Sequence, residues 1–222
     1  ETRRLSFRQL QENVNRLATG LLDLGITAGD RVAIVDVNTP EVIESYLAAS
    51  LLDAIFVPLN YRAKTEELSH MLHTCKPSVL LVGDRYQDLA DSVVYSDGIE
   101  PKMIAIGSPR TSWHSYSNLL DESRPTQQLS PSGADSEITI LLFTAGTTGH
   151  PKAVMLSHDS FSSYMLSSVP PADPDHEERN ILSVPLYHIA GIQGALASIF
   201  GGRTLIMLRQ FDPVSLCHHL IL

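Results

Sequence analysis

The residues best suited to chemistry lie between positions 144 and 152, where the chain reads TAGTTGHPK. The glycines let backbone N–H groups turn toward an anion, the threonines add hydroxyl donors, and Lys152 closes the segment with a full positive charge. The flanking runs ITILLF and AVMLSH read as buried strands, so both ends of the segment are predicted to be rigid. Together these features predict a loop that binds phosphate groups.

Two other structures compete with this interpretation. The common phosphate loop has the pattern GxxxxGK[ST] and runs directly into a helix, whereas here Gly146 and Gly149 are too close together and Pro151 precedes Lys152. A long β-hairpin turn is the second alternative, in which Thr and Gly reflect turn chemistry alone. Because hairpin loops usually have about two to five residues, a longer loop that carries a lysine favours a function.

The same string resembles the nucleotide-binding signature of the adenylate-forming (AMP-binding) superfamily, which includes acyl-CoA synthetases, luciferases and peptide-synthetase adenylation domains. That signature reads roughly TSGTTGxPKxV followed by SH, and the chain matches it through His158, with Ala145 where serine is usual. We expect the missing hydroxyl to cost about 1 kcal/mol, as for one neutral hydrogen bond. The string PLYHIAG at 185–191 resembles the family motif PxxHxxG, and the segment ending in FVPLNYR is also similar, although Asp53 stands where glycine is common.

The resemblance implies specific roles for residues of both motifs. It implies that His188 is catalytic and orients the substrate carboxylate near the α-phosphate. A histidine in an apolar stretch is otherwise often a core residue, but Gly191 at the motif spacing favours the functional interpretation. No metal ligand is predicted, because His70 and His73 share a helix face without a third ligand. The implied cofactor-binding residues are Thr144, Ala145, Gly146, Thr147, Thr148, Gly149 and Lys152.

The activity implied by the resemblance is that of an ATP-dependent acyl-CoA synthetase, an acid-thiol ligase. Such an enzyme joins a carboxylic acid to ATP, releases pyrophosphate, and passes the acyl group to coenzyme A. We expect a fatty acid as substrate and Mg²⁺ as a cofactor. The alternatives are an amino-acid adenylation domain and a non-catalytic nucleotide or protein interaction module, but the PLYHIAG string favours the acyl-CoA synthetases.

Composition excludes several other classes of function. A net charge of −9 and a pI near 5.4 argue against nucleic acid and anionic membrane surfaces as general partners. Cys75 and Cys217 form no CxxC pattern and are too few for a disulfide framework, so a reducing cytoplasm is the expected location. No run approaches the roughly 20 apolar residues of a membrane span, and the first residues contain neither a signal-peptide stretch nor an initiator Met.

The spacing of apolar residues indicates the elements that must position these motifs. Apolar residues at steps of three and four from Leu10 to Leu24 predict a helix that ends at Gly25. Thr39 and Pro40 predict the start of a second helix between the strands RVAIVD and FVPLN. Because VLLVG and KMIAIG continue this alternation, we predict an α/β fold with parallel-rich sheets flanked by helices.

The resemblance also implies a domain organisation. The chain is expected to be a truncated large N-terminal domain, in which residues of about 29–168 form a first α/β subdomain with the phosphate loop at 144–152. Residues of about 1–28 and 178–222 are expected to form an incomplete second α/β subdomain, with the β-barrel and the C-terminal domain absent. Because the adenine, ribose and C-terminal lysine motifs of the family are missing from the sequence, we expect the isolated chain to be inactive.

Overall fold

The computed structural model describes residues 3–95, 100–123, 129–132, 138–144, 151–173 and 175–221. Within these residues, the strands are β1 (Arg31–Val35), β2 (Ile55–Pro58), β3 (Val79–Gly83), β4 (Lys102–Ile106), β5 (His114–Ser115), β6 (Ile138–Thr144), β7 (Lys152–Ser157), β8 (Arg179–Leu182) and β9 (Thr204–Met207). The helices of the same residues are α1 (Phe7–Asp23), α2 (Pro40–Leu51), α3 (Thr65–Cys75), the 3-10 helix η1 (Asp84–Tyr86), α4 (Gln87–Asp91), α5 (Tyr116–Glu122), α6 (His158–Ser168), α7 (Ile189–Phe200) and α8 (Pro213–Ile221). None of these described helices is long and apolar enough to cross a membrane.

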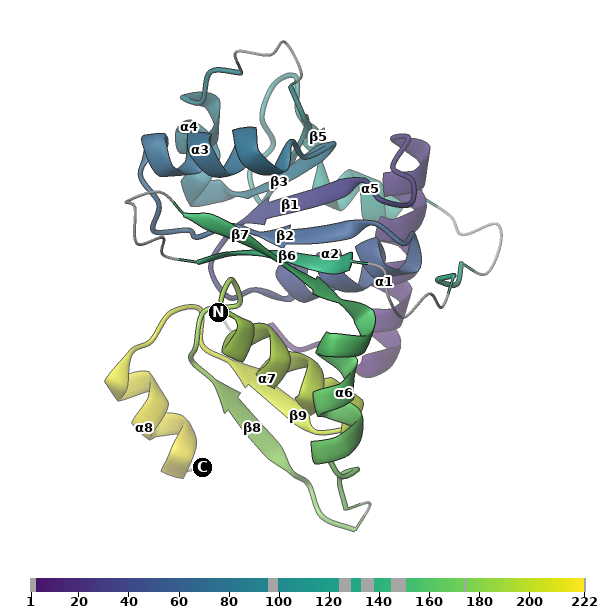
Figure 1. Cartoon of the computed structure of the whole chain (residues 1–222). Helices are drawn as coiled ribbons and strands as arrows, with labels where there is room; N and C mark the ends of the chain where they lie inside the picture. Colours follow the sequence, from purple (N-terminus) through teal and green to yellow (C-terminus); the bar gives the residue numbers. More distant parts are fainter. Residues whose placement is uncertain are drawn as a thin grey trace.

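The strands form a larger sheet in the order β5-β4-β3-β1-β2-β6-β7 and a smaller sheet of β8 and β9. Neighbouring strands of the larger sheet pair in parallel, except that β6 and β7 are antiparallel. Figure 1 shows the larger sheet in the upper part of the molecule and the smaller sheet below it, beside α6, α7 and α8. The α/β fold class predicted from the sequence is therefore confirmed.

Helix α1 ends where its sequence predicts, and a capping box marks its start. The Ser6 hydroxyl accepts a hydrogen bond from the Gln9 N–H, and the Gln9 side chain accepts one from the Ser6 N–H at 2.8 Å, which completes a capping box. Leu24 is the C-cap residue, and Gly25 follows in the left-handed region with φ 85°. The buried residues of this helix are Val14, Leu17, Ala18, Gly20 and Leu21.

Helices cover both faces of the larger sheet. Val32 and Ile34 of β1 belong to a hydrophobic cluster with α1, α2 and α5, whereas Ala33 and Val35 belong to a second cluster with α3 and α4. Successive strand residues therefore enter different cores, as the two-residue period of a strand requires. Burial on both faces is why these strands read as continuous apolar runs in the sequence.

The hairpin of β6 and β7 corrects one expectation, namely that both of its strands are buried. In β6, which lies between β2 and β7, Ile140 is fully buried. In β7, by contrast, Val154 is 40% exposed and Met155 is 66% exposed. The reason is that β7 is an edge strand with a neighbour on one side only, a position that local sequence does not reveal.

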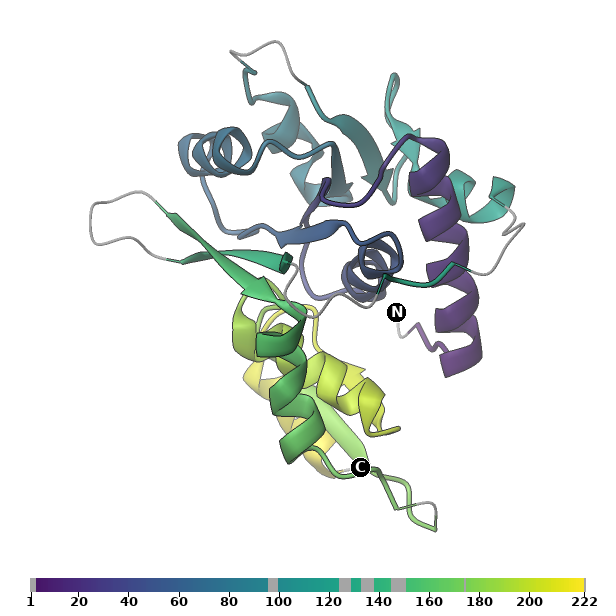
Figure 2. The same ribbon diagram turned by 45° about the vertical axis from the view of Figure 1, so that its right-hand side comes forward.

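Helix α6 follows β7 and packs against α7, which in turn contacts β8 and β9. Figure 2 shows this smaller unit extending below the larger sheet. Helix α1 packs against α2 and α5, which cover the larger sheet. The subdomain boundaries expected from the sequence stay a prediction, and the contacts of α1 favour grouping it with the larger sheet.

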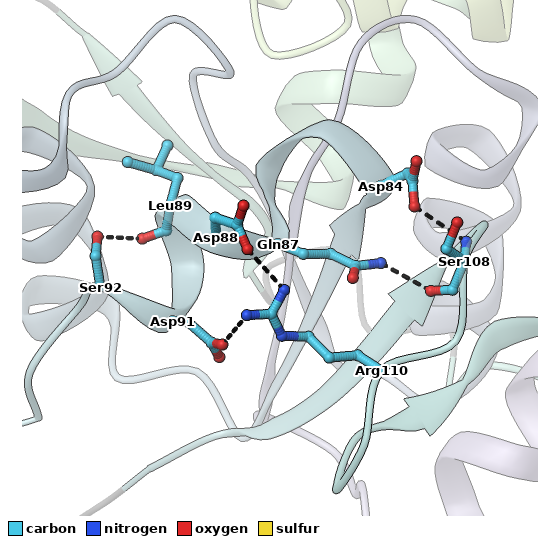
Figure 3. A network of polar contacts seen from close by, with 8 residues as sticks. All are labelled: Asp84, Gln87, Asp88, Leu89, Asp91, Ser92, Ser108 and Arg110. Atoms are coloured by element: carbon cyan, nitrogen blue, oxygen red, sulfur yellow. Dashed lines mark hydrogen bonds and ion pairs between the residues drawn. The ribbon is translucent and has the colours of Figure 1, made fainter.

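A polar network holds the turn after β4 against the short helices after β3, as Figure 3 shows. The Arg110 guanidinium donates to Asp88 at 2.9 Å and also to Asp91. The Gln87 side chain donates to the Ser108 carbonyl at 2.9 Å. Exposed ion pairs of this kind contribute about 0–1 kcal/mol each, so the network mainly fixes the course of two connections at the carboxyl edge of the larger sheet.

Asp53 lies in the turn between α2 and β2, in the left-handed region with φ 53°. Glycine adopts this conformation without strain, and aspartate tolerates it better than most residues. Both oxygens of the Asp53 carboxylate accept the Ser132 N–H, with N···O distances of 3.0 Å to Oδ1 and 2.9 Å to Oδ2. This contact ties the turn to a distant segment and gives the side chain a local structural role.

Candidate functional site

The predicted phosphate loop is held at its base by the hairpin. Thr144 is the register partner of Lys152, and the Thr144 hydroxyl donates to the Lys152 carbonyl at 3.5 Å. Both residues are exposed, so a hydroxyl and an ammonium group face solvent where the two strands separate. The middle of the loop lies outside the described residues, and the roles of Ala145, Gly146, Thr147, Thr148 and Gly149 stay predictions.

Helix α3 contacts the base of the loop. The His70 Nε2 atom lies 3.1 Å from the Pro151 carbonyl, directly before Lys152. The Nδ1 atom of His73 lies 2.7 Å from the Ser69 carbonyl within the same helix. No group of three His, Cys, Asp or Glu residues that could hold a metal is found in the described part of the chain. The position of His70 therefore indicates that it positions the loop.

His188 occupies the N-cap position of α7. Its N–H donates to the Pro185 carbonyl at 3.0 Å, and its own carbonyl accepts the N–H groups of Gly191 and Ile192 at 3.0 and 3.1 Å. Its side chain is exposed, and its ring centroid lies 4.2 Å from that of Tyr187. The backbone of His188 is therefore fixed by the first turn of the helix, while its ring remains accessible.

The glycine of the PxxHxxG pattern has a physical reason in this structure. A Cβ atom at Gly191 would lie 2.1 Å from the Pro185 carbonyl oxygen and 3.1 Å from the Val184 carbonyl oxygen. The first distance is far inside van der Waals contact and the second is tight, so a residue without a Cβ atom is needed where α7 approaches the segment before it. The spacing between Pro185, His188 and Gly191 thus encodes a close backbone turn that presents the histidine.

The surroundings of His188 favour the neutral form of its ring. Partial desolvation and the nearby Arg62 guanidinium lower the pKa of His188 below its ordinary value of 6.5. Arg62 lies over the Tyr61 ring at 5.6 Å, and the Tyr61 ring lies 5.2 Å from that of Tyr187. The site therefore combines an imidazole that favours its neutral form with a nearby guanidinium cation, and that cation attracts an anion.

Sequence reasoning missed the residues that join the two motifs. Tyr61 contacts Tyr187 beside His188, while His70, nine positions further along the chain, contacts the base of the loop. The short segment from 61 to 70 therefore contacts both parts of the site. The FVPLNYR string contains Arg62, so its cation could have been noted from the sequence, but its nearness to His188 depends on the fold.

Asp36 follows β1 at the carboxyl edge of the larger sheet. Its carboxylate accepts the Val37 N–H at 2.7 Å and the Thr39 hydroxyl at 3.4 Å. A Cβ at Gly83, the last residue of β3, would lie 2.3 Å from the Asp36 Oδ1 atom. Burial raises the pKa of Asp36 to about 6. Ligands of open α/β sheets bind outside this edge, where strand order reverses, so Asp36 belongs to the same region as the site.

These features define an α/β protein whose sheet edge carries a hairpin with a hydroxyl and a lysine at its base, and in which the N-cap of α7 exposes a histidine. The chain belongs to the AMP-binding enzyme family, whose model matches residues 1–221. The family resemblance drawn from the sequence motifs is confirmed.

Curated proteins similar to this chain include several CoA ligases. The chain is 30% identical over 212 residues to an indoleacetate-CoA ligase of Aromatoleum aromaticum, a match that covers 95% of this chain and 41% of that protein. It is 32% identical over 212 residues to a long-chain-fatty-acid-CoA ligase of Mycobacterium tuberculosis, covering 94% of this chain and 41% of that protein. The chain therefore spans about two-fifths of the length of these relatives.

Solved structures show the same fold. A long-chain-fatty-acid CoA ligase from Rhodopseudomonas palustris matches with a TM-score of 0.87 at 28% identity, covering 98% of this chain and 54% of that one. An inhibitor-bound N-terminal domain from Mycobacterium tuberculosis matches with a TM-score of 0.85 at 27% identity, covering 99% of this chain and 54% of that one. The arrangement of both sheets is therefore that of N-terminal domains in this family.

Proposed function

We propose that this chain forms the phosphate-binding and acid-binding part of an ATP-dependent acyl-CoA synthetase, an acid-thiol ligase. The observation that carries the proposal is the hairpin, which pairs Thr144 with Lys152 and holds the matched signature between two fixed ends. The similar proteins include ligases named for indoleacetate and long-chain fatty acids, and a feruloyl-CoA synthase of Amycolatopsis. A carboxylic acid is the substrate class these names have in common.

The first chemical step brings together two anions. An oxygen of the carboxylate attacks the α-phosphorus of ATP, the bond to pyrophosphate breaks, and an acyl-adenylate forms. Lys152 and the loop hydroxyls neutralise the phosphates, so that the negative charge developing on the leaving pyrophosphate is stabilised. Because β7 rather than a helix follows the loop, this stabilisation comes from side chains and loop amides and not from a helix dipole.

His188 is proposed to orient the substrate carboxylate. A neutral imidazole donates one hydrogen bond to a carboxylate oxygen, and the lowered pKa of His188 keeps the ring in that form near neutral pH. Arg62 supplies positive charge beside it, which favours entry of an anionic acid. The thiol of coenzyme A then attacks the acyl carbon, AMP leaves, and a thioester forms.

Magnesium, coenzyme A, a fatty-acid substrate and a cytoplasmic location complete the proposal. Mg²⁺ would bind through the ATP phosphates, as this ion commonly does in nucleotide sites. The fatty acid is supported by the long-chain-fatty-acid-CoA ligase among the similar proteins. A reducing compartment is proposed because Cys75 and Cys217 are too few for a disulfide framework.

A substitution at Lys152 tests the proposal in the complete protein that the gene encodes. Acid-dependent exchange between ATP and labelled pyrophosphate would be measured with fatty, aromatic and amino acids. We expect Lys152→Ala to lower kcat/KM for ATP by roughly 100- to 1,000-fold, as for loss of one transition-state donor. Lys102→Ala is the matched control, because Lys102 lies on β4 and its ammonium donates to the Leu24 carbonyl, so its rate should equal that of the wild type.

Each result separates the candidate functions. Equal exchange rates for wild type and Lys152→Ala would show that the loop does not bind the phosphates. Exchange with amino acids alone would favour an amino-acid adenylation domain. The 222-residue chain by itself is expected to release no pyrophosphate. If calorimetry instead shows that this chain binds ATP tightly without turnover, a non-catalytic nucleotide-binding module is the better description.

A further inference from the structure

Asn38 is a buried polar residue in the connection between β1 and α2, and its side chain is only 2% exposed. Its amide nitrogen donates to the carbonyls of Val184 and Leu208, each at 3.0 Å. Its amide oxygen accepts the Leu186 N–H at 2.8 Å. Its backbone N–H donates to the Arg209 carbonyl at 3.1 Å. Every donor of the Asn38 side chain is therefore used, and all of these partners lie more than 140 positions away in the sequence.

The segment held by Asn38 is the one that precedes His188. Residues 183–188 form neither helix nor strand, so they have no regular hydrogen-bond ladder of their own. Leu186 packs in the cluster with α1 and α2, whereas Tyr187 packs in the cluster with α3 and α4. The segment thus crosses the carboxyl edge of the larger sheet, and the Asn38 side chain binds it at the point of crossing.

We propose that Asn38 is a positioning residue, which fixes the 184–186 backbone so that Tyr187 and His188 face the reacting acid. Asn38 bonds the chain on both sides of Pro185, and the Pro185 carbonyl is the acceptor for the His188 N–H. A shift of Pro185 would therefore pass directly to the histidine. The catalytic part of this role rests on the function proposed above for His188.

The side-chain geometry explains why asparagine is required here. Two N–H donors and one acceptor are needed at one buried point, and a primary amide is the short side chain that offers both. Asn38→Asp keeps the acceptor for Leu186 but sets a carboxylate against the Val184 and Leu208 carbonyls. Asn38→Ala removes all three bonds and leaves these three backbone groups without that partner, which is costly when they are buried.

The first test uses nuclear magnetic resonance on the 222-residue chain, and so needs no enzymatic activity. In the wild type, we expect the Leu186 N–H to exchange with solvent at least ~100-fold more slowly than an unprotected amide. In Asn38→Ala, the ring signals of Tyr187 and His188 should shift, and the pKa of His188 should rise toward its ordinary value. Ser198→Ala is the matched control, because Ser198 is a buried polar residue of α7 that bonds Asn180 and not the 184–186 segment.

The second test measures kinetics in the complete protein. A misplaced histidine should lower kcat by about 10- to 100-fold in Asn38→Ala while KM for ATP changes less than about twofold. Ser198→Ala should leave both constants unchanged, even if it unfolds at a lower temperature. If the complete protein shows no acid-dependent exchange, the proposed function fails, whereas the resonance measurements still decide whether Asn38 seats His188.

The proposal is overturned by any of three results. Exchange of the Leu186 N–H can be measured in the wild type alone. Fast exchange of this group therefore counts against the proposal even if no variant folds. Unchanged His188 signals and pKa in Asn38→Ala, or equal shifts in Ser198→Ala, would show that Asn38 only adds general stability. Asn38→Asp provides a second variant. If it loses kcat while the Leu186 N–H stays protected from exchange, the two amide donors of Asn38 are needed.

Discussion

Asp30 and Asp36 lie at opposite ends of β1, and their environments shift their pKa values in opposite directions. Burial raises the pKa of Asp36 to about 6, because few groups compensate for the loss of water. Burial also acts on Asp30, but hydrogen bonds from Ser78 and Thr27 together with the charge of Arg31 outweigh it and lower the pKa. Two identical side chains near one strand thus have different electrostatic roles, determined by their neighbours.

The raised pKa of Asp36 predicts a stability that falls as pH rises. The folded chain binds this proton more tightly than the unfolded chain, so the free energy of unfolding decreases between about pH 4 and pH 6 and stays lower above that range. The Asp36→Asn substitution removes the charge but keeps an acceptor for the Val37 N–H, and it leaves Asn38 unchanged. We expect this variant to be more stable than wild type at pH 7, by at most about 3 kcal/mol, and nearly equal to it at pH 4.

Urea denaturation at both pH values measures this effect. Asp30→Asn is the control of opposite sign, because the folded state favours the charged form of Asp30. Its loss should destabilise the chain at pH 7 and matter less at pH 3. Lower stability of Asp36→Asn than of the wild type at pH 7 would contradict the electrostatic account.

Partial desolvation and the charge of Arg62 both lower the pKa of His188. Because a nearby positive charge disfavours a second one, Arg62→Gln should raise the pKa of His188 toward its ordinary value. In the complete enzyme, the acid side of the pH–rate profile should move to higher pH in the same direction. Histidine titration by nuclear magnetic resonance measures the shift, with Arg16→Gln on α1 as a control that should not change it. An unchanged His188 titration in Arg62→Gln would disprove the coupling.

At the scale of elements, the turn between β8 and α7 and the hairpin of β6 and β7 both hold residues of the site in place, but by different interactions. The hairpin fixes a loop at two ends by strand pairing, whereas the turn fixes His188 by helix capping and a close approach at Gly191. The capped helix holds its first residue in one place, which suits a group that must orient a carboxylate.

Gly191 provides a direct test of the turn. In Gly191→Ala the new Cβ would overlap the Pro185 carbonyl oxygen, so we expect destabilisation of about 1–3 kcal/mol and a displaced His188 ring. Gly194→Ala on the same helix is the matched control, because its nearest neighbour is the Leu182 Cδ1 atom at an ordinary 3.5 Å. That variant should gain up to about 1 kcal/mol from better helix propensity. Thermal unfolding of both variants measures the difference, and equal effects would refute the steric argument.

At the scale of the whole molecule, the smaller sheet is part of the main core. Leu182, Leu186 and Ile192 belong to the same hydrophobic cluster as Phe56 and Ile140 of the larger sheet. Figures 1 and 2 show α7 lying against the smaller sheet, beneath the larger one. Since the cores are continuous, the chain is expected to unfold in a single cooperative transition.

Ile192 tests this continuity, because it is fully buried in α7. Ile192→Ala should lower the free energy of unfolding by about 2–5 kcal/mol and shift the unfolding of both sheets together. Ile189→Ala, three positions earlier and 40% exposed, is the control and should change stability by less than about 1 kcal/mol. Denaturation would be followed both by circular dichroism and by the amide signals of β1 and β8. Separate transitions for these two strands would contradict a shared core.

Several features could be predicted from local sequence because their causes are local. The capping box of Ser6 and Gln9, the Pro40 start of α2 and the 3.6-residue spacing of α1 depend on residues within a few positions of each other. The spacing of Gly191 from His188 is also visible in the local sequence, whereas the steric need for glycine there came from the structure. The family signature around Lys152 is likewise a contiguous string, so the order of its residues is enough to recognise it.

The tertiary structure decided what depends on contacts between distant segments. The edge position of β7, the nearness of Arg62 to His188, and the hydrogen bonds of Asn38 to the segment from 184 to 186 join parts of the chain that no local pattern connects. The sequence by itself determined the elements and the chemical groups available at the site. Their arrangement arises only in the folded sheet, because the parallel pairing of β1, β2, β3 and β6 brings the carboxyl ends of these strands to one edge.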